Sequence, residues 1–194
     1  MSAMAATLER DTELMLRVRE GCPSSFALLL ERNRGPVVNF VYRMVQSQAV
    51  AEELAQEVFL RVYKSRASYE PTAKFSTWLF RIATHLAINH LRDTRNEKGQ
   101  ARLDEEREDG VAIQVADGTP TAEQRLVGAQ RAEEIRAAVA ALPEKQRAAV
   151  LMHKYQEMDY RQIASVLGCS ESAVKSILWR AYETLRTRLA HYAS

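Results

Sequence analysis

The sequence predicts an all-α protein made of two small helical domains that are joined by a flexible linker. Three observations predict this class. Helix-favouring Ala, Leu, Glu and Arg dominate the 194 residues, which include only 7 Gly and 5 Pro. Apolar residues recur with helical spacing from Asp11 to about Asp93, and again from Thr121 onward. Between these stretches the period is lost, so we expect domains at 1–95 and 121–194 and a linker at 96–120.

The first domain is expected to contain three main helices. Pro23 suits the first turn of one helix, which Pro36 in the stretch RGP is expected to kink or break. The segment 49–66 predicts a second helix with Leu54, Val58 and Val62 facing inward. The stretch SYEPTAKFS predicts a loop, and residues 77–93 predict a further amphipathic helix.

The second domain is expected to follow an acidic linker. Residues 96–120 hold three Lys/Arg against seven Asp/Glu and include Gly and Pro, as is typical of a tether. A capping box at Thr121 predicts that a helix restarts there, and Pro143 is expected to open the next helix. We find no internal repeat.

The stretch from Asp159 to Leu185 predicts a helix-turn-helix. Asp159 and Gln162 suit a capping box, Gly168 suits a left-handed turn, and Ser170 suits the cap of the second helix. The buried stripe of that second helix is expected to be Val174, Leu178, Ala181 and Leu185, which leaves polar side chains to face DNA. A plain helical hairpin is the alternative, and the combination of caps, Gly and small Ala164 favours DNA binding.

Charge and composition narrow the class further. Residues 61–95 hold seven Lys/Arg against two acids, and residues 141–194 hold eight against five, so two basic blocks flank the acidic one. Such blocks attract phosphate backbones, although solvated helical faces explain the charge equally well. Two widely spaced cysteines and no long apolar run favour a reduced, cytoplasmic protein without membrane insertion. The four histidines are scattered along the sequence and suggest no metal site. The sequence also contains no catalytic constellation and no cofactor motif, so we expect that the protein is not an enzyme and binds no cofactor.

Two blocks of sequence resemble the extracytoplasmic-function class of bacterial sigma factors. AEELAQEVFLRVY and KFSTWLFRIATHLAINHLR resemble region 2, and the segment from Leu142 to Leu189 resembles region 4. The resemblance covers about 20–95 and 121–190. It implies a transcription initiation factor that binds core RNA polymerase, through the beta-prime clamp and the beta flap, and directs it to promoter DNA. It also implies control by an anti-sigma factor.

The resemblance assigns three candidate sites. Gln56 and Glu57, with Glu53 beside them, match the polymerase-docking positions, although a solvated face is the reading from the residues alone. The minus-ten element is expected to meet the loop that captures a flipped base and the helix after it: Lys74, Phe75, Ser76, Thr77, Arg81, His85, Asn89 and Arg92. The minus-thirty-five element is expected to meet Arg161, Gln162, Ser170, Ser172, Lys175, Ser176, Trp179 and Arg180.

Several positions stay open at this level. Helical spacing with Ile82 favours a core role for Trp78 over base stacking, and the role of Phe75 is undecided. Ile177 and Tyr182 stand where family members often carry Arg; Ile177 would contact a thymine methyl or widen the apolar stripe. The acidic linker would mimic RNA in the polymerase or serve as a simple tether.

Two other functions compete with a promoter-directing factor. A dimeric helix-turn-helix repressor or activator would bind palindromic duplex DNA by itself. A sigma-like adaptor would bind polymerase without opening promoters. The sequence does not decide whether the two domains pack together.

Overall fold

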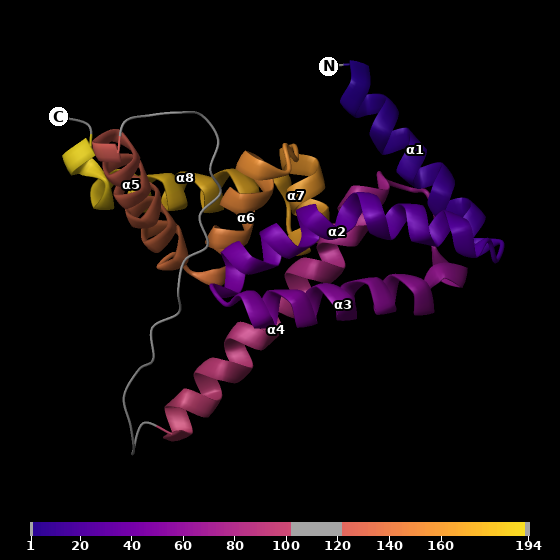
Figure 1. Ribbon diagram of the computed structural model, residues 1–194, viewed down its shortest axis with the longest axis horizontal. Coiled ribbons are helices and arrows are strands. Elements are labelled where there is room, and N and C mark those ends of the chain that lie inside the picture. The colour runs from indigo at the N-terminus through magenta and orange to yellow at the C-terminus, as the bar shows by residue number, and fades with distance from the viewer. Residues whose placement is uncertain (1, 102–121, 193–194) are drawn as a thin grey trace.

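The chain folds into helices around one continuous apolar core (Figure 1). The computed structural model describes the backbone of residues 2–101 and 122–192, and side chains within 10–97 and 130–192. No strand occurs in these ranges, so the all-α prediction is confirmed. The first domain consists of α1 (Ser2–Arg19), α2 (Pro23–Val45), α3 (Gln48–Lys64), the short 3-10 turn η1 (Arg66–Ser68) and α4 (Phe75–Ala101). The second consists of α5 (Ala122–Ala140), α6 (Glu144–Tyr155), α7 (Tyr160–Leu167), α8 (Glu171–Arg188) and the 3-10 turn η2 (Ala190–Tyr192).

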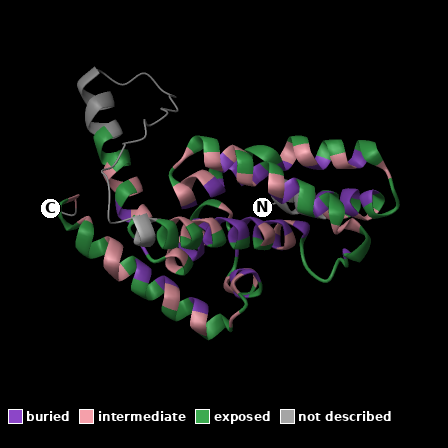
Figure 2. Cartoon of the chain, turned by 90° about the horizontal axis from the view of Figure 1, so that it is seen from below, coloured by how far each residue is buried: buried purple, intermediate pink, exposed green. Residues whose placement is uncertain are grey.

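In the first domain, helices α1 to α4 each turn an apolar face inward (Figure 2). Leu29 of α2, Val58 of α3 and Leu79 of α4 are completely buried in this core. Phe40 and Phe80 meet edge to face, with ring centroids 5.2 Å apart, and so join α2 to α4. Of the three inward positions predicted for α3, Val58 and Val62 are buried, and Leu54 is half-buried against the core.

The sequence predicted a kink or a break at RGP, and the break does not occur, because α2 runs from Pro23 to Val45 through Pro36. Proline removes a helical hydrogen bond and costs about 3 kcal/mol inside a helix. Leu29, Val37 and Val41 lie on both sides of Pro36 and are fully buried, at roughly 2 kcal/mol each. Their burial exceeds the cost of the proline, whose own ring faces solvent.

Helix α4 ends later than the sequence suggested. It continues to Ala101, so residues 96–101 of the expected linker are helical. Apolar spacing ends near Asp93 because the last turns of α4 extend past the core, where exposed side chains such as Arg95 and Glu97 carry no apolar stripe. Residues 102–121, with the rest of the expected linker and the capping box at Thr121, lie outside the described residues.

In the second domain, α6, α7 and α8 pack around Leu151, Met152 and Ile163, which are all buried. Helix α6 begins directly after Pro143, as predicted. Arg147 of α6 donates hydrogen bonds to the carbonyl oxygens of Ala140 and Leu142. Burial lowers the pKa of the Arg147 guanidinium. Through these two hydrogen bonds, the Arg147 side chain pairs with backbone carbonyl oxygens at the end of α5 that have no partner within the helix.

The two domains pack against each other in the described structure, a point that the sequence left open. Helix α7 lies on α4, and α6 lies against both α2 and α4. Figure 1 shows α5 to α8 gathered on one side of the molecule, with the start of α1 on the other side. Because buried residues of both domains belong to one cluster, the core continues across the boundary.

Cys22 stands just before α2 and carries a more acidic thiol than an ordinary cysteine. The hydroxyls of Ser24 and Ser25 lie 3.2 and 3.3 Å from its Sγ and lower the pKa of Cys22 to about 7. Because only the thiolate reacts, we expect the alkylation rate of Cys22 to rise as pH passes through about 7. Iodoacetamide labelling followed by mass spectrometry measures this rate. Replacing both serines by Ala should move the midpoint to higher pH, and an unmoved midpoint would contradict their role.

Candidate nucleic-acid and partner interfaces

An outward face of α3 carries the three expected docking residues. Ser47 caps the helix through the Val50 amide, and Ala51, Ala55 and Val62 anchor the opposite face in the core. Glu53, Gln56 and Glu57 are three and four residues apart, so their side chains share one face of the helix. Glu53 and Gln56 are exposed, and Glu57 is half-buried.

The carboxylate of Glu57 already has a partner within its own helix. Arg61 Nε lies 2.7 Å from Glu57 Oε1, in an i to i+4 ion pair. Glu53 is exposed, so its carboxylate is open to solvent, and it forms no ion pair with any other residue that the structure describes. A binding partner therefore meets one free carboxylate, one free amide and one carboxylate that it must share with Arg61.

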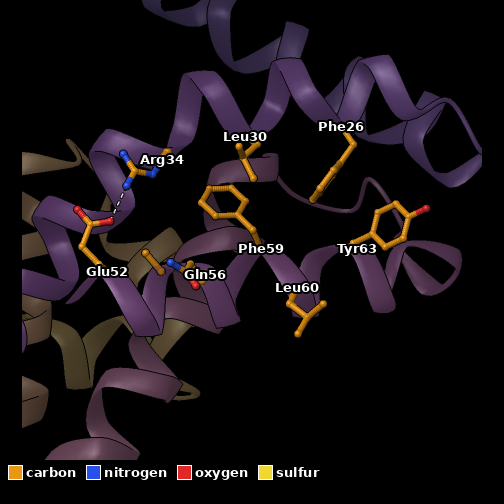
Figure 3. Close-up of a pocket in the computed structure, with 9 residues that line it drawn as sticks. Phe26, Leu30, Arg34, Glu52, Gln56, Phe59, Leu60 and Tyr63 are labelled. Carbon is orange, nitrogen blue, oxygen red and sulfur yellow. Dashed lines mark hydrogen bonds and ion pairs between the residues drawn. The ribbon is translucent and has the colours of Figure 1, made fainter. Parts of the chain in front are cut away.

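An apolar groove lies beside this face, between α2 and α3, and sequence reasoning missed it. Figure 3 shows Phe26 and Leu30 of α2 opposite Phe59 and Tyr63 of α3, with Gln56 at the groove wall. The groove has a volume of about 380 Å³. The ring centroids of Phe26 and Tyr63 lie 5.0 Å apart. Leu60 and Tyr63 remain 45% and 40% exposed. Their i+4 and i+7 spacing from Gln56 is the signal that would have revealed the groove.

Helix α4 presents a polar stripe from Arg81 to Arg92. Arg81, His85, Asn89 and Arg92 are exposed, and their spacing of four, four and three residues places them on one face. Lys74, just before the helix, is exposed as well, and Ser76 is half-buried. The face from Arg81 to Arg92 thus carries cations and hydrogen-bonding groups, and Lys74 and Ser76 lie at the start of the helix.

Two residues of the expected minus-ten set do not belong to that surface. Phe75 is completely buried against Tyr69 and Trp78, with ring centroids 6.2 and 6.1 Å away. Thr77 is 3% exposed and accepts a hydrogen bond from Gln162 in the second domain. Neither side chain is available to a base in this structure, because α4 begins at Phe75 and turns both residues inward. The prediction that Trp78 packs rather than stacks on a base agrees with its place in this cluster.

The helix-turn-helix has the predicted local geometry. Asp159 Oδ1 accepts from the Gln162 amide at 2.8 Å, and Gln162 Oε1 accepts from the Asp159 amide at 3.0 Å. Gly168 ends α7 with φ of +64°, and Ser170 caps α8 through the Ala173 amide. Val174, Leu178 and Ala181 are buried, as expected, whereas Leu185 is half-buried.

The outer face of α8 is polar apart from one large aromatic ring. Ser172, Lys175, Ser176 and Arg180 are exposed around Trp179, which is 67% exposed. Arg161 at the start of α7 is also exposed. The side chains of Ser170 and Gln162 serve the helix caps, so they offer less to a ligand than the sequence suggested.

The structure gives the two unusual α8 positions roles within the second domain. Ile177 is half-buried and packs on the core, so it widens the apolar stripe. The Tyr182 hydroxyl lies 3.1 Å from His153 Nδ1, which ties α8 to α6. Burial raises the pKa of Tyr182, with a further contribution from nearby Tyr160.

Within the described residues, no three His, Cys, Asp or Glu side chains gather as a metal site would require. In the same ranges, no helix is both long and apolar enough to cross a bilayer.

Comparisons with known proteins agree with this geometry. The family model described as Sigma-70 region 2 matches residues 29–97, and the model described as Sigma-70, region 4 matches residues 132–185. The ECF RNA polymerase sigma factor SigW of Bacillus subtilis is 31% identical over 178 residues, which are 89% of this chain and 93% of SigW. This chain belongs to the ECF RNA polymerase sigma factors. It is also similar to the RNA polymerase sigma factor CarQ of Myxococcus xanthus, with 33% identity over 90% of this chain and 95% of CarQ.

Two solved structures share the fold. One is the sigma factor RpoE in complex with the anti-sigma factor NepR from Bartonella quintana, with a TM-score of 0.68, 21% identity and coverage of 85% and 96% of the two chains. The other is CnrH in complex with the cytosolic domain of CnrY, with a TM-score of 0.66, 18% identity and coverage of 94% and 98%. In this ECF sigma factor, region 2 therefore spans α2 to α4, and region 4 spans the end of α5 to α8. The competing prediction that the chain is a dimeric repressor does not agree with this family membership.

Proposed function

We propose that this ECF sigma factor directs core RNA polymerase to promoters through three surfaces. The acidic face of α3 docks on the beta-prime clamp, the polar stripe of α4 holds the opened minus-ten strand, and α8 reads the minus-thirty-five element. The observation that supports the proposal is that one chain carries two separate, exposed faces of cations and polar side chains, on α4 and on α8. A protein that binds duplex DNA only through its helix-turn-helix does not need the polar face of α4.

The α3 surface suits a basic and partly apolar partner. Glu53 and Gln56 are exposed, and the apolar groove opens directly beside them. Aromatic and aliphatic side chains surrounded by polar groups are typical of the energetic centre of an interface. A helix of the clamp with basic and apolar side chains would satisfy both parts.

The α4 stripe suits single-stranded DNA. Arg81 and Arg92 supply positive charge along about three turns, and His85 and Asn89 offer hydrogen bonds to bases or sugars. Phe75 does not belong to this face, because its buried ring packs in the core under the first turn of α4. A cationic face without exposed aromatic rings would hold the backbone and read the bases by their edges.

The α8 face suits the major groove of duplex DNA. Lys175 and Arg180 flank Trp179 on a helix whose opposite side is fixed in the core. Cations at such positions contact phosphates or guanine edges, and an exposed ring contacts apolar groups of thymine. We also assign to region 4 the contact with the polymerase beta flap.

We further propose control by an anti-sigma factor and action in the cytoplasm. The structural relative RpoE is in complex with the anti-sigma factor NepR, and CnrH is in complex with the cytosolic domain of CnrY. The exposed apolar side chains of the α2–α3 groove, Leu60 and Tyr63, give such a regulator a surface that competes with polymerase.

Reconstitution with core polymerase tests the proposal. The purified chain and core enzyme should co-elute in size-exclusion chromatography and should produce discrete transcripts from promoters of the source genome. Core enzyme alone should produce none of these transcripts. Failure to co-elute, or co-elution without promoter-dependent transcripts, would overturn the proposed function, and the second outcome would favour the adaptor.

Salt dependence tests the contacts of α8. Lys175→Ala and Arg180→Ala should each lower the slope of log affinity against log salt by about 0.9, because each loses one phosphate contact. Fluorescence anisotropy with duplex DNA at several salt concentrations measures the slope. Arg136→Ala is the matched control, since Arg136 pairs with Glu133 on α5. A slope that stays unchanged in either variant would remove that residue from the phosphate contacts.

A further inference from the structure

One face of α1 contacts both ends of the loop that precedes α4. The loop consists of residues 70–74, which are all exposed, and it joins Tyr69 to Phe75. At its first end, Arg19 Nη1 donates to the carbonyl oxygen of Tyr69 at 3.1 Å. At its second end, the Phe75 amide donates to Thr12 Oγ1 at 3.4 Å. Thr12 and Arg19 are seven residues apart, so they share one face of α1 and lie about 10 Å apart along it.

Helix α4 depends on this outside contact at its first amide. The amides of the first turn have no partner within a helix, and a side-chain oxygen next to the helix start often accepts from one of them. Lys74 directly precedes α4, and its ammonium group can only donate. The carbonyl oxygen of Lys74 accepts from the Thr77 amide at 3.0 Å. The Thr12 hydroxyl therefore supplies the acceptor that the Lys74 side chain lacks.

Helix α1 is itself fixed against α2 next to Thr12. Asp11 is buried, lies 3.0 Å from Arg32 Nε in an ion pair and accepts from Asn33 Nδ2 at 3.2 Å. Met15 and Val18, between Thr12 and Arg19 in the sequence, are buried in the core. The position of α1 on the domain is therefore determined by buried contacts that do not involve the loop.

The two ends of the loop also contact each other. The rings of Tyr69 and Phe75 meet edge to face, with their centroids 6.2 Å apart, and both residues are buried. The loop thus rises between two fixed ends, and its own side chains remain open to a ligand. A segment whose ends are fixed has fewer conformations to lose when it binds.

We propose that α1 is a positioning element for the minus-ten surface. Through Thr12 and Arg19, it holds the loop 70–74 in the shape that receives a base flipped out of the opened strand. The proposal rests on the proposed function, and it adds two residues that precede the segment matched by the region 2 family model. In this role neither side chain contacts DNA, because each acts through the backbone at one end of the loop.

Hydrogen exchange on the free chain tests the contact without DNA or polymerase. Thr12→Val removes the acceptor and keeps the volume of the side chain, whereas Thr12→Ser keeps the hydroxyl. We expect the Phe75 amide to exchange about three- to tenfold faster in Thr12→Val, and at nearly the wild-type rate in Thr12→Ser. Nuclear magnetic resonance measures the rate at this amide. An unchanged rate in Thr12→Val would overturn the role of Thr12.

The DNA test uses the sigma factor bound to core polymerase. The probes are single-stranded oligonucleotides with the minus-ten element of a promoter found by the reconstitution, either intact or with one abasic nucleotide at each position in turn. In the wild type, removal of the captured base should weaken binding most. In Thr12→Val and in Arg19→Met, that loss should shrink about three- to tenfold, and the losses at other positions should stay unchanged. Arg17→Met, exposed on another face of α1, is the matched control and should keep the wild-type profile.

Two results of the DNA test would overturn the proposal. An unchanged profile in both Thr12→Val and Arg19→Met would mean that the loop keeps its shape without these contacts. Losses that shrink equally at every position, together with weaker binding to core polymerase, would mean that α1 only stabilises the domain. If the wild type itself shows no position of largest loss, or does not bind core polymerase, the proposed function fails. The positioning role then fails with it, even when hydrogen exchange confirms the contact.

Discussion

Replacing Gln56 and Glu57 together by Ala is expected to weaken binding to core polymerase by about 2–4 kcal/mol, roughly 30- to 1,000-fold. The two side chains lie at the centre of the α3 face, between exposed Glu53 and the apolar groove. Truncation at such a place leaves basic groups of the partner without their acceptors, which costs more than the loss of a contact at the rim. Titration of fluorescently labelled chain with core polymerase measures the change.

Two further variants make this result specific. Glu13→Ala removes an exposed acid from α1 and should leave polymerase binding unchanged. Arg61→Ala frees the Glu57 carboxylate from its 2.7 Å ion pair and should preserve or strengthen binding. Wild-type affinity in the Gln56 and Glu57 double variant would refute the assignment of the α3 face.

Phe75→Ala is expected to lower the free energy of unfolding by about 3–5 kcal/mol. Phe75 is completely buried between Tyr69 and Trp78, so its removal leaves a cavity under the first turn of α4. Phe75→Leu keeps most of the volume and should cost less than about 1.5 kcal/mol. Urea unfolding followed by circular dichroism measures both changes.

The same variants distinguish a core role from base recognition. If Phe75 supports the helix, Phe75→Leu should keep promoter activity. A stable Phe75→Ala protein that loses minus-ten binding would instead make Phe75 a base contact and contradict its burial in the free chain.

Local signals predicted the second domain well because its helices are short and clearly delimited. Asp159, Gly168 and Ser170 each determine one helix end through a backbone interaction within a few residues. This geometry depends on residues that are close in the sequence, so it can be predicted from the local pattern. The buried stripe of α8 followed from the same helical spacing.

The errors lie where a helix end depends on the tertiary structure. The loop residues before α4 suggested that the helix begins at Thr77, but it begins at Phe75. From Phe75 the buried residues Leu79 and Ala83 continue at intervals of four, so an earlier start would have placed Phe75 in the core. The continuity of α2 through Pro36 likewise depends on side chains that other helices cover.

The interdomain contacts could not be predicted from local pattern, and the spacing of Leu60 and Tyr63 from Gln56 reveals only the α3 side of the groove. Thr77 and Gln162 are 85 residues apart, and each is a plausible polar surface residue by itself. The groove depends on how α2 and α3 place Phe26, Leu30 and Phe59 around a space that neither helix encloses alone.

Mapping of unpaired thymines on a promoter tests the central claim most directly. Potassium permanganate oxidises unstacked thymines, so it detects opening of the minus-ten element by the sigma factor and core polymerase together. We predict reactive thymines at the minus-ten element only when both proteins are present, and their loss when Arg81 and Arg92 are both replaced by Ala. Unchanged reactivity in the Arg81 and Arg92 variant would contradict the assignment of α4 as the surface that holds the opened strand. Reactivity that is absent with both proteins present, or equal with core polymerase alone, would contradict the proposed function.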